Sequence, residues 1–180
     1  NQESVLDNES ITLGAWNEEC QIAFVSLPDE TFSISLINPD GSNQTLITDD
    51  AYDDVFPNWT HYGEKVAFLS TRSDTGKYEI FVIDTNGNNA IQFTENRNDV
   101  ENYDQYAWAP ASEQIAYVSK ENGNDDIFIA EIGGSSQITT DLSSDSSPTW
   151  SPNSDQIAFV SDRDGGDNDI FVIDVENGNL

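Results

Sequence analysis

The stretch that decides the fold is PTWSPNSDQIAFVSDRDG, residues 148–165, which the apolar run IFVID follows at residues 170–174. It contains a tryptophan, a Pro-Asn turn, a short apolar run, a polar turn with glycine and a second apolar run. This order of features occurs four times along the 180 residues. Short β-type runs that repeat every 40 to 50 residues are typical of solenoids and propellers. The chain is therefore interpreted as a repeat protein.

One tryptophan marks each repeat, and successive tryptophans are 42 to 49 residues apart. An apolar run begins six or seven residues after each of them, at residues 22–24, 66–68, 115–117 and 157–159. A second apolar run and, in the first three repeats, a thinner strand follow. We expect each tryptophan to head the first strand of its repeat and to pack between sheets, rather than to form a platform for sugars or cations. These residues are Trp16, Trp59, Trp108 and Trp150.

The middle runs of each repeat are apolar on both faces of a strand. In residues 80–83, for example, Phe81 and Ile83 point to the face opposite Ile80 and Val82. A strand with two apolar faces has to be covered on both sides, whereas a β-sandwich strand would alternate with one polar face. No amphipathic helix of useful length is present. The sequence predicts an all-β fold, a β-propeller of four-stranded antiparallel blades with four repeats.

Residues 148–165 closely resemble the PD40 repeat of TolB-like β-propellers, whose pattern reads roughly P-x-W-S-P-D-G-x-x-I-A-F-x-S-x-R-D-G. The repeat at residues 56–94 matches nearly as well, the first repeat replaces the S-P-D-G turn, and the third lacks its glycine. The resemblance implies a single propeller domain over residues 1–180, with repeats at about 15–55, 56–105, 106–147 and 148–180. It implies no particular function, because such repeats serve many unrelated proteins.

The fourth repeat lacks an outer strand, and the N-terminus carries an unassigned one. Residues 1–7 align with residues 43–49, the outer strand of the first repeat. We therefore expect a strand within residues 1–14 to complete the last blade, with residues 4–7 pairing to residues 170–174, because closure removes an exposed edge. Three arrangements stay open: a closed four-bladed ring, a fragment of a larger propeller, and closure between neighbouring chains, which gives dimers or filaments.

The charge excludes several classes of partner. With 34 acidic against 6 basic residues, the net charge is −28, which opposes binding to nucleic acid or an anionic membrane. No apolar run approaches the roughly 20 residues that cross a bilayer, and aromatic residues make up 11% of the chain, unlike a disordered acidic tail.

The lone Cys20 cannot form an internal disulfide, and Asn1 looks like a mature or trimmed start. We expect an extracellular, cell-surface or periplasmic protein.

The polar turn of the fourth repeat is the candidate cation site. Four carboxylates lie close together around two glycines, a composition that suits the many oxygen ligands of Ca²⁺. The EF-hand spacing is absent, and the alternative interpretation is a solvated turn of residues that favour turns. The candidate ligands are Asp162, Asp164, Asp167 and Asp169.

Residues for catalysis are missing from the sequence. His61 is the only histidine, no nucleophile elbow of the form G-x-S-x-G accompanies it, and a metal-centred hydrolase would need more His or Cys. Nothing basic near Cys20 would activate its thiol. The sequence predicts that this chain is not an enzyme.

Three asparagines are candidate glycosylation sites. Asn8, Asn43 and Asn58 head N-x-S/T sequons and are candidate glycosylation sites, with Asn58 the poorest because it adjoins a core tryptophan. The leading hypothesis is a non-catalytic propeller that binds protein or self-associates through its N-terminal strand as an assembly scaffold. The alternatives are a propeller accessory to a prolyl-oligopeptidase-like hydrolase of a longer gene, and a calcium- or glycan-binding propeller.

Overall fold

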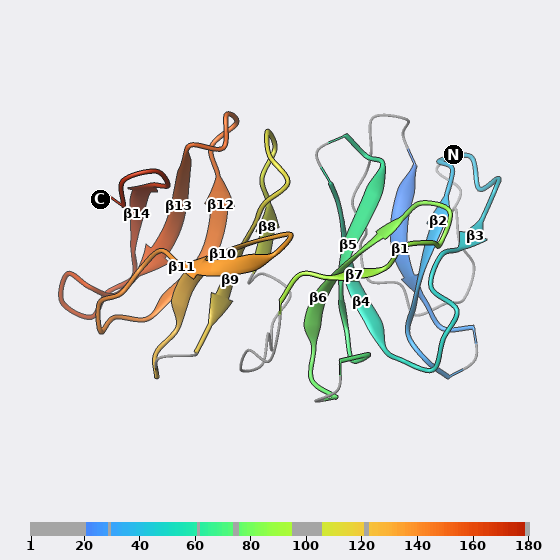
Figure 1. Ribbon diagram of the computed structural model, residues 1–180, viewed down its shortest axis with the longest axis horizontal. Helices are drawn as coiled ribbons and strands as arrows, with labels where there is room; N and C mark the ends of the chain where they lie inside the picture. The colour runs from blue at the N-terminus through green and yellow to red at the C-terminus, as the bar shows by residue number, and fades with distance from the viewer. Residues whose placement is uncertain are drawn as a thin grey trace, which may run out of the picture. The chain divides into compact units, whose positions relative to one another are not determined.

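Four antiparallel β-sheets make up the part of the chain that the computed structural model describes (Figure 1). That part comprises residues 21–28, 30–60, 62–73, 76–94, 106–120 and 123–178. Every regular element within it is a strand, which confirms the all-β prediction. None of these described segments forms a helix of the length and hydropathy needed to span a bilayer. The chain divides into two compact units, residues 1–92 and residues 93–180.

The first unit contains two sheets that follow the order of the chain. One sheet has the strands β1 (Ile22–Ser26), β2 (Ser33–Ile37) and β3 (Thr45–Leu46). The other has β4 (Asp54–Trp59), β5 (Lys65–Ser70), β6 (Glu79–Asp84) and β7 (Ile91–Gln92). Each strand pairs with the next in the sequence, as in the blade of a propeller.

The second unit also contains two sheets, but its four-stranded sheet comes first in the chain. Its first sheet has β8 (Tyr106–Trp108), β9 (Ile115–Ser119), β10 (Asp126–Glu131) and β11 (Gly134–Gln137). Its second sheet has β12 (Asp145–Trp150), β13 (Gln156–Ser161) and β14 (Asp169–Asp174). Among the described residues, β14 is therefore the outermost strand of its sheet (Figure 1).

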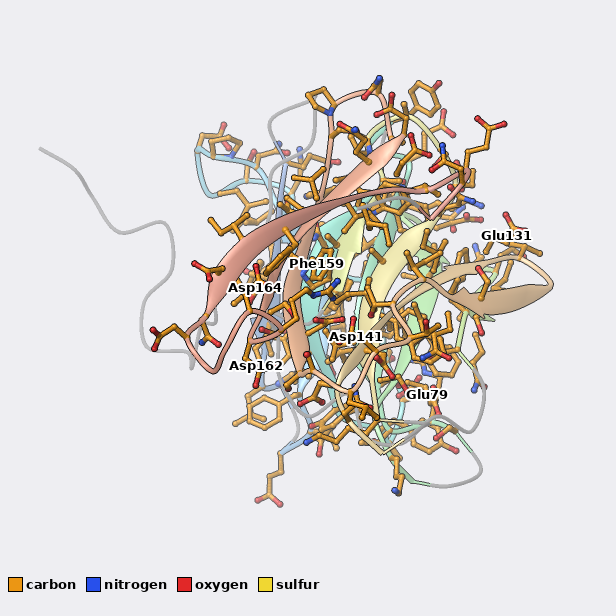
Figure 2. The ribbon with its side chains drawn as sticks, turned by 90° about the vertical axis from the view of Figure 1, so that its left-hand side faces the viewer. Glu79, Glu131, Asp141, Phe159, Asp162 and Asp164 are labelled. Carbon is orange, nitrogen blue, oxygen red and sulfur yellow. The ribbon has the colours of Figure 1, made fainter. Side chains whose placement is uncertain are left out.

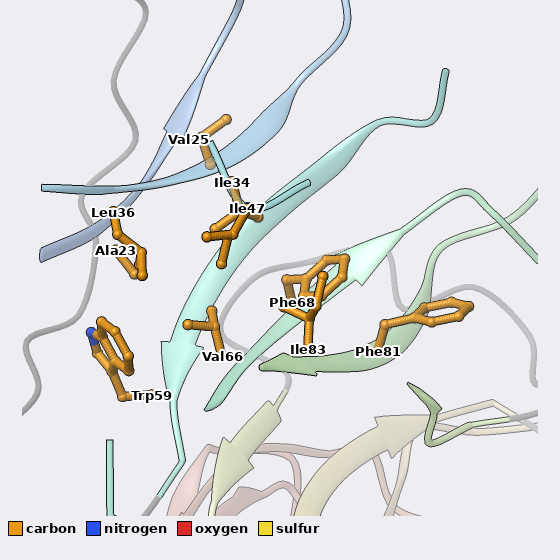
Figure 3. Packing of buried hydrophobic residues seen from close by; sticks show 10 residues of the cluster. All are labelled: Ala23, Val25, Ile34, Leu36, Ile47, Trp59, Val66, Phe68, Phe81 and Ile83. Carbon is orange, nitrogen blue, oxygen red and sulfur yellow. The ribbon is translucent and has the colours of Figure 1, made fainter. Parts of the chain in front are cut away.

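The core of the first unit lies between its two sheets. Figure 3 shows Ala23 and Ile34 of the first sheet close to Trp59 and Val66 of the second, with Ile47 after β3 beside them. All five are buried. Each middle strand thus presents an apolar face to the neighbouring sheet, which is the arrangement that the two-faced runs predict.

The core of the second unit has the same construction. Ala116 and Ile127 of one sheet share a cluster with Trp150 and Phe159 of the next. The indole Nε1 of Trp150 donates a hydrogen bond to the carbonyl oxygen of Ala107, 3.0 Å away. The packing role predicted for the tryptophans is confirmed for Trp59 and Trp150, both of which lie between two sheets.

The position of the tryptophans within their strands differs from the expectation. Trp59, Trp108 and Trp150 end the strands β4, β8 and β12 rather than heading them. The apolar run after each tryptophan is the second strand of the sheet. The first strand of each sheet could not be predicted from the sequence, because it contains polar residues and, in β12, Pro148. Trp16 lies outside the described residues.

A bulge interrupts both of the long first strands at the same place. The pairing shifts between Val55 and Asn58 in β4, and between Ser146 and Thr149 in β12. Within each shift one residue adopts a left-handed backbone, Phe56 at φ 54° and Ser147 at φ 52°. Such an insertion bends and twists the strand, and its recurrence at equivalent positions shows that it belongs to the repeat.

Candidate functional site

The outer strand of a sheet is attached in the same way in both units. In the first unit, Ile34 N–H donates to Thr48 Oγ1 at 2.8 Å, and Ile47 N–H donates to Ile34 O at 2.9 Å. The second unit has the same two bonds. Ile127 N–H donates to Thr139 Oγ1 at 2.9 Å, and the N–H of residue 138 donates to Ile127 O at 2.8 Å. In both units, an apolar residue followed by threonine thus bonds the backbone N–H and carbonyl oxygen of an isoleucine in the adjacent strand, β2 or β10.

The corresponding residue of the fourth sheet is Ile170. It lies opposite Val160 in β13 as Ile34 lies opposite Val25 in β1. The backbone groups of Ile34 point away from its partner strand, toward the outer strand. By the same pairing geometry the N–H and O of Ile170 point away from β13, toward the open edge of the sheet. No described strand lies there.

The side chains of β14 are exposed where their equivalents are buried. Ile170 is 77% exposed, whereas Ile34, Ile80 and Ile127 are each 0% exposed. Two residues further on, Val172 is 46% exposed, and its equivalents Leu36, Val82 and Ile129 are at most 5% exposed. Ile34 and Ile127 are buried by packing against the next sheet, so the exposure of Ile170 and Val172 marks an uncovered face of the fourth sheet. This face adjoins a strand edge with which no described strand pairs, and such an edge is a template for pairing with another strand. We take the edge of β14 as the candidate interaction site.

The predicted cation site forms the hairpin loop before β14. Asp162 and Asp164 lie on this loop (Figure 2), where Gly165 and Gly166 have φ of 121° and 99° and allow the tight turn. The Asp162 Oδ1 atom accepts a hydrogen bond from the Ser144 N–H at 2.9 Å. One of the four candidate carboxylates is thus bonded to the backbone of the preceding linker.

The described residues do not gather a metal centre at this hairpin. In the described part of the chain, no group of three or more Asp, Glu, His or Cys side chains is placed to hold an ion. This includes the candidate ligands Asp162, Asp164, Asp167 and Asp169. The calcium hypothesis therefore stays a prediction, and the geometry adds no support to it.

An arginine next to the hairpin organises the surrounding charges. The Arg163 Nη2 atom contacts both carboxylate oxygens of Asp145, at 3.0 and 3.1 Å, and Asp141 Oδ2 at 2.9 Å. Its guanidinium lies 5.0 Å from the ring centre of Phe159 and 4.8 Å from that of Phe171. Asp145 is fully buried, so this cation compensates a carboxylate that has no access to water.

The first unit contains the same arrangement around Arg72. Its Nη2 atom contacts Asp54 Oδ2 at 2.7 Å and Asp50 Oδ2 at 3.1 Å, and the guanidinium lies 5.1 Å from the Phe68 ring centre and 5.2 Å from that of Phe81. Sequence reasoning missed both clusters. The signal was a Ser-x-Arg after the second strand, combined with an aspartate five residues before the tryptophan, in the second and fourth repeats only.

Burial and hydrogen bonds shift the pKa values of several carboxyls. Burial raises the pKa of Asp54 despite opposing hydrogen bonds from Ser70 and Thr48 and the charge of Arg72. Burial also raises the pKa of Asp126, against a hydrogen bond from Asn124. These carboxyls begin strands and tie them to their neighbours.

Asp141 behaves in the opposite way. Burial, the largest single influence, raises its pKa, but hydrogen bonds from Ser143 and the charge of Arg163 together lower the pKa below its ordinary value of 3.8. The Ser143 N–H donates to Asp141 Oδ1 at 2.8 Å. The carboxylate form of Asp141 therefore holds the linker between the third and fourth sheets.

A depression of about 310 Å³ lies at the turn between β10 and β11. Its polar side chains are those of Gln114, Glu131, Ser135 and Ser136, and the Gln114 Nε2 atom donates to Glu131 Oε2 at 3.4 Å. Much of the remaining lining comes from the glycines at residues 133–134.

The remaining candidate residues are the sequon asparagines, Cys20 and His61. Asn43 is exposed in the turn before β3, and Asn58 is half-buried within β4. Asn43 is thus the better placed of the two for a glycan. Asn8, Cys20 and His61 lie outside the described residues, as does the N-terminal segment 1–14, so the structure does not test the strand pairing predicted for it.

Blades of three or four antiparallel strands, with a tryptophan between successive sheets, define a β-propeller repeat protein. The sequence profile of the PD40 family, the TolB β-propeller domain, matches residues 14–180. The chain belongs to this family, which confirms the resemblance read from its repeats. No curated protein matches the chain in sequence.

Solved structures share the fold at low sequence identity. TolB from Acinetobacter baumannii superposes with a TM-score of 0.74 at 21% identity, over 97% of this chain and 43% of that one. The putative TolB from Agrobacterium tumefaciens gives 0.72 at 19% identity, over 94% and 63%. A puromycin hydrolase gives 0.72 at 12% identity, over 94% of this chain and 28% of the hydrolase. The chain thus spans about half the length of the TolB proteins it resembles.

Proposed function

We propose that this propeller is a non-catalytic module that binds protein, or builds an assembly, by accepting a β-strand at the edge of β14. The single observation that carries the proposal is the outer edge of β14, with which no described strand pairs, next to a sheet face on which Ile170 is 77% exposed. Strand addition supplies main-chain hydrogen bonds for affinity and uses side-chain positions for specificity.

The candidate occupants are a partner protein, the N-terminal strand of this chain or of a neighbouring copy, and any chain that follows residue 180. Deleting residues 1–9 tests the second source. If the N-terminal strand covers the edge, the truncated protein should be less stable and should aggregate, because an apolar strand edge is left open. Sedimentation of the intact protein across a concentration series separates the cases: closure within a chain gives a monomer throughout, and closure between chains gives growing assemblies.

A truncated protein as stable and as monodisperse as the parent shows that residues 1–9 do not cover the edge. The proposal as a whole fails if the backbone amides of β14 exchange as slowly as those of β10 in the truncated protein at low concentration. That result would mean that the edge is already covered by something other than residues 1–9 or a second chain.

We place the module outside the cytoplasm, at the cell surface, in the extracellular space or in the periplasm. The support is compositional: the sequence has 34 acidic and 6 basic residues and a single cysteine. The test is fractionation of the natural source with an antibody against the module. Recovery in the cytoplasmic fraction alone contradicts the assignment.

A second candidate function is favoured by the similarity to a puromycin hydrolase, which this chain matches over 28% of the hydrolase's length. A propeller of this kind could be an accessory domain of a hydrolase within a longer gene product. Sequencing the complete gene decides between the two functions, because the accessory role requires a hydrolase domain with its own nucleophile and base.

Calcium binding by the Asp162–Asp169 hairpin is the remaining proposal. Ca²⁺ should then raise the melting temperature more than Mg²⁺ at equal ionic strength, because Mg²⁺ loses its water reluctantly. Equal shifts with Ca²⁺, Mg²⁺ and matched NaCl would show only screening of the −28 charge.

A further inference from the structure

The depression at the turn between β10 and β11 lies where the hairpin is shorter than its equivalents. Glu131 pairs with Gly134, so only Ile132 and Gly133 connect the two strands. The corresponding connections of the first and second sheets span residues 38–44 and 85–90. The third sheet thus lacks a longer loop at this end, and the depression of about 310 Å³ lies there.

In two other sheets, the longer connection bonds the carboxylate at the end of the third strand. Asp84 ends β6, and its Oδ2 atom accepts a hydrogen bond from Asn89 Nδ2 at 2.7 Å. Asp174 ends β14, and its Oδ1 atom accepts from the backbone N–H groups of residues 176–177, both at 3.1 Å. Glu131 ends β10 in the same way, but the short turn contributes no such donor to it.

The charge of Glu131 is not compensated by any described residue. Its one hydrogen bond to a described residue comes from Gln114 Nε2 and is 3.4 Å long, and none of the ion pairs in the described part of the chain includes it. In the second sheet, Lys65 occupies the position of Gln114, and its Nζ atom lies 3.9 Å from Asp84 Oδ1. The same position in the repeat therefore holds a cation in one sheet and a neutral amide in the other.

Around this carboxylate, the depression combines an apolar wall with further hydrogen-bond acceptors. Ile132 is 65% exposed, and Ile129 lies beside it in the lining. The Gln114 Oε1 atom accepts a hydrogen bond from Ser112 Oγ at 3.0 Å, which holds the amide in place. The hydroxyls of residues 135–136 also line the depression. A ligand with a cationic head and an aliphatic stem matches both kinds of surface.

We propose that this depression binds the side chain of an arginine that a basic partner polypeptide presents. The guanidinium pairs with the Glu131 carboxylate, and the methylene stem lies against Ile132. A guanidinium has five donors in one plane and pairs with a carboxylate through two parallel bonds. It therefore suits several neighbouring acceptors better than the compact ammonium of lysine does. The net charge of −28 attracts a basic partner.

The arginine site is separate from the edge of β14, because its lining comes from residue 114 and residues 129–136 alone. Figure 2 shows Glu131 beside the β10–β11 hairpin, whereas Asp162 and Asp164 lie on the loop before β14. The proposal thus goes beyond the strand-accepting function, and either of the two can fail without the other.

The test follows the amide signals of Ile132, Gly134 and Ser135 in the ¹⁵N-labelled 180-residue chain. Physiological salt limits the reach of the net charge to about 8 Å. The ligands are capped tripeptides with arginine, lysine or citrulline between two glycines, and citrulline has the shape of arginine without its charge. We expect a dissociation constant on the order of 1 mM for the arginine peptide. Binding should be about three-fold weaker for lysine and about ten-fold weaker for citrulline, which loses the charge-assisted bonds.

Variants of the protein assign the binding to Glu131. Glu131→Gln should abolish the preference for arginine over citrulline, whereas the matched control Glu176→Gln, at an exposed residue after β14, should retain it. Gln114→Lys places a cation opposite Glu131, as Lys65 lies opposite Asp84, and should weaken binding of the arginine peptide about five-fold. Its control Gln114→Met has a similar length without charge and should change the binding less than about two-fold.

Three results would overturn the proposal. Equal binding of the arginine and citrulline peptides, or a preference for arginine that survives Glu131→Gln, excludes a guanidinium pair at this carboxylate. Shifts of equal size at the turn of residues 85–90 and at the β10–β11 turn show only the general attraction of cations to an acidic chain. Tighter binding of free butylguanidinium than of the arginine peptide assigns the depression to a small free cation and excludes the polypeptide partner.

Discussion

The indole of Trp150 is hydrogen-bonded through Nε1 to the carbonyl oxygen of Ala107, at 3.0 Å, so the fourth sheet is fastened to the first strand of the third. The equivalent indole one repeat earlier differs. Trp108 is buried against Phe93, with ring centres 5.6 Å apart, and its Nε1 has no hydrogen-bond partner among the described residues. Two tryptophans at the same place in the repeat therefore differ in their polar contact, and this difference can be measured.

Replacing Trp150 by phenylalanine should cost about 1 kcal/mol more than replacing Trp108 by phenylalanine. Both changes remove similar apolar volume, but Trp150→Phe also leaves the Ala107 oxygen without its donor. Trp108→Phe removes a buried N–H that has no partner among the described residues. Urea unfolding of the two variants provides the comparison, and equal losses would show that the Trp150 hydrogen bond contributes nothing measurable.

Replacing Arg163 by methionine should lower the free energy of unfolding by about 3 kcal/mol, because the buried Asp145 carboxylate loses its compensating cation. Lys120→Met is the matched control. It breaks the ion pair of Lys120 Nζ with Asp125 Oδ1 at 3.7 Å, in which the lysine side chain is 57% exposed, and should cost under about 1 kcal/mol. Denaturant unfolding at neutral pH measures both. Losses of the same size would contradict a special role for the Arg163 cluster.

Replacing Asp141 by asparagine should destabilise the protein in a pH-dependent way. Because the folded state lowers the pKa of Asp141 below 3.8, its carboxylate contributes stability above that value, and the contribution is lost as pH falls through the lower folded pKa. The variant should be less stable than the parent at pH 7, by under about 1 kcal/mol for this partly exposed pair. The difference should shrink below pH 4, as followed by thermal unfolding across pH. A constant difference would refute the linkage.

Replacing Ser147 by glycine should leave the protein as stable as before or stabilise it by up to about 1 kcal/mol, because serine has a steric cost at φ 52° that glycine does not. Its neighbour Ser146 is the control. Ser146 pairs with Val160 in the ladder, so Ser146→Gly should destabilise by roughly 0.5–1 kcal/mol. Melting temperatures of the two variants decide, and a destabilised Ser147→Gly would mean that the bulge is not strained.

The repeat could be predicted from the sequence because a strand that is buried on both faces has consecutive apolar residues. Ile80, Phe81, Val82 and Ile83 are all apolar, and all four are buried. The first strand of each sheet was not readable. Its bulge breaks the alternation of side chains, and Pro148 within β12 argues locally against a strand.

The candidate site was only partly predictable. Within residues 148–180 no apolar run follows residues 170–174, and the structure places no strand beyond β14 among the described residues. The role of Thr48 and Thr139 could not be foreseen, because a threonine at a strand end has no fixed partner until the register is known. The same holds for Arg163, whose partner Asp145 lies 18 residues away in the sequence and directly beside it in the fold.

The two arginine clusters leave the solvent-facing surface with even fewer cations than the composition indicates. The side chains of Arg72 and Arg163 are only 14% and 12% exposed, and both are neutralised by their own aspartates. An approaching polypeptide therefore meets an almost purely anionic particle, whose repulsion reaches about 8 Å in physiological salt and about 30 Å in dilute buffer. We therefore expect two copies of this chain to repel each other more strongly in dilute buffer than in physiological salt, whereas an uncharged partner meets no such barrier.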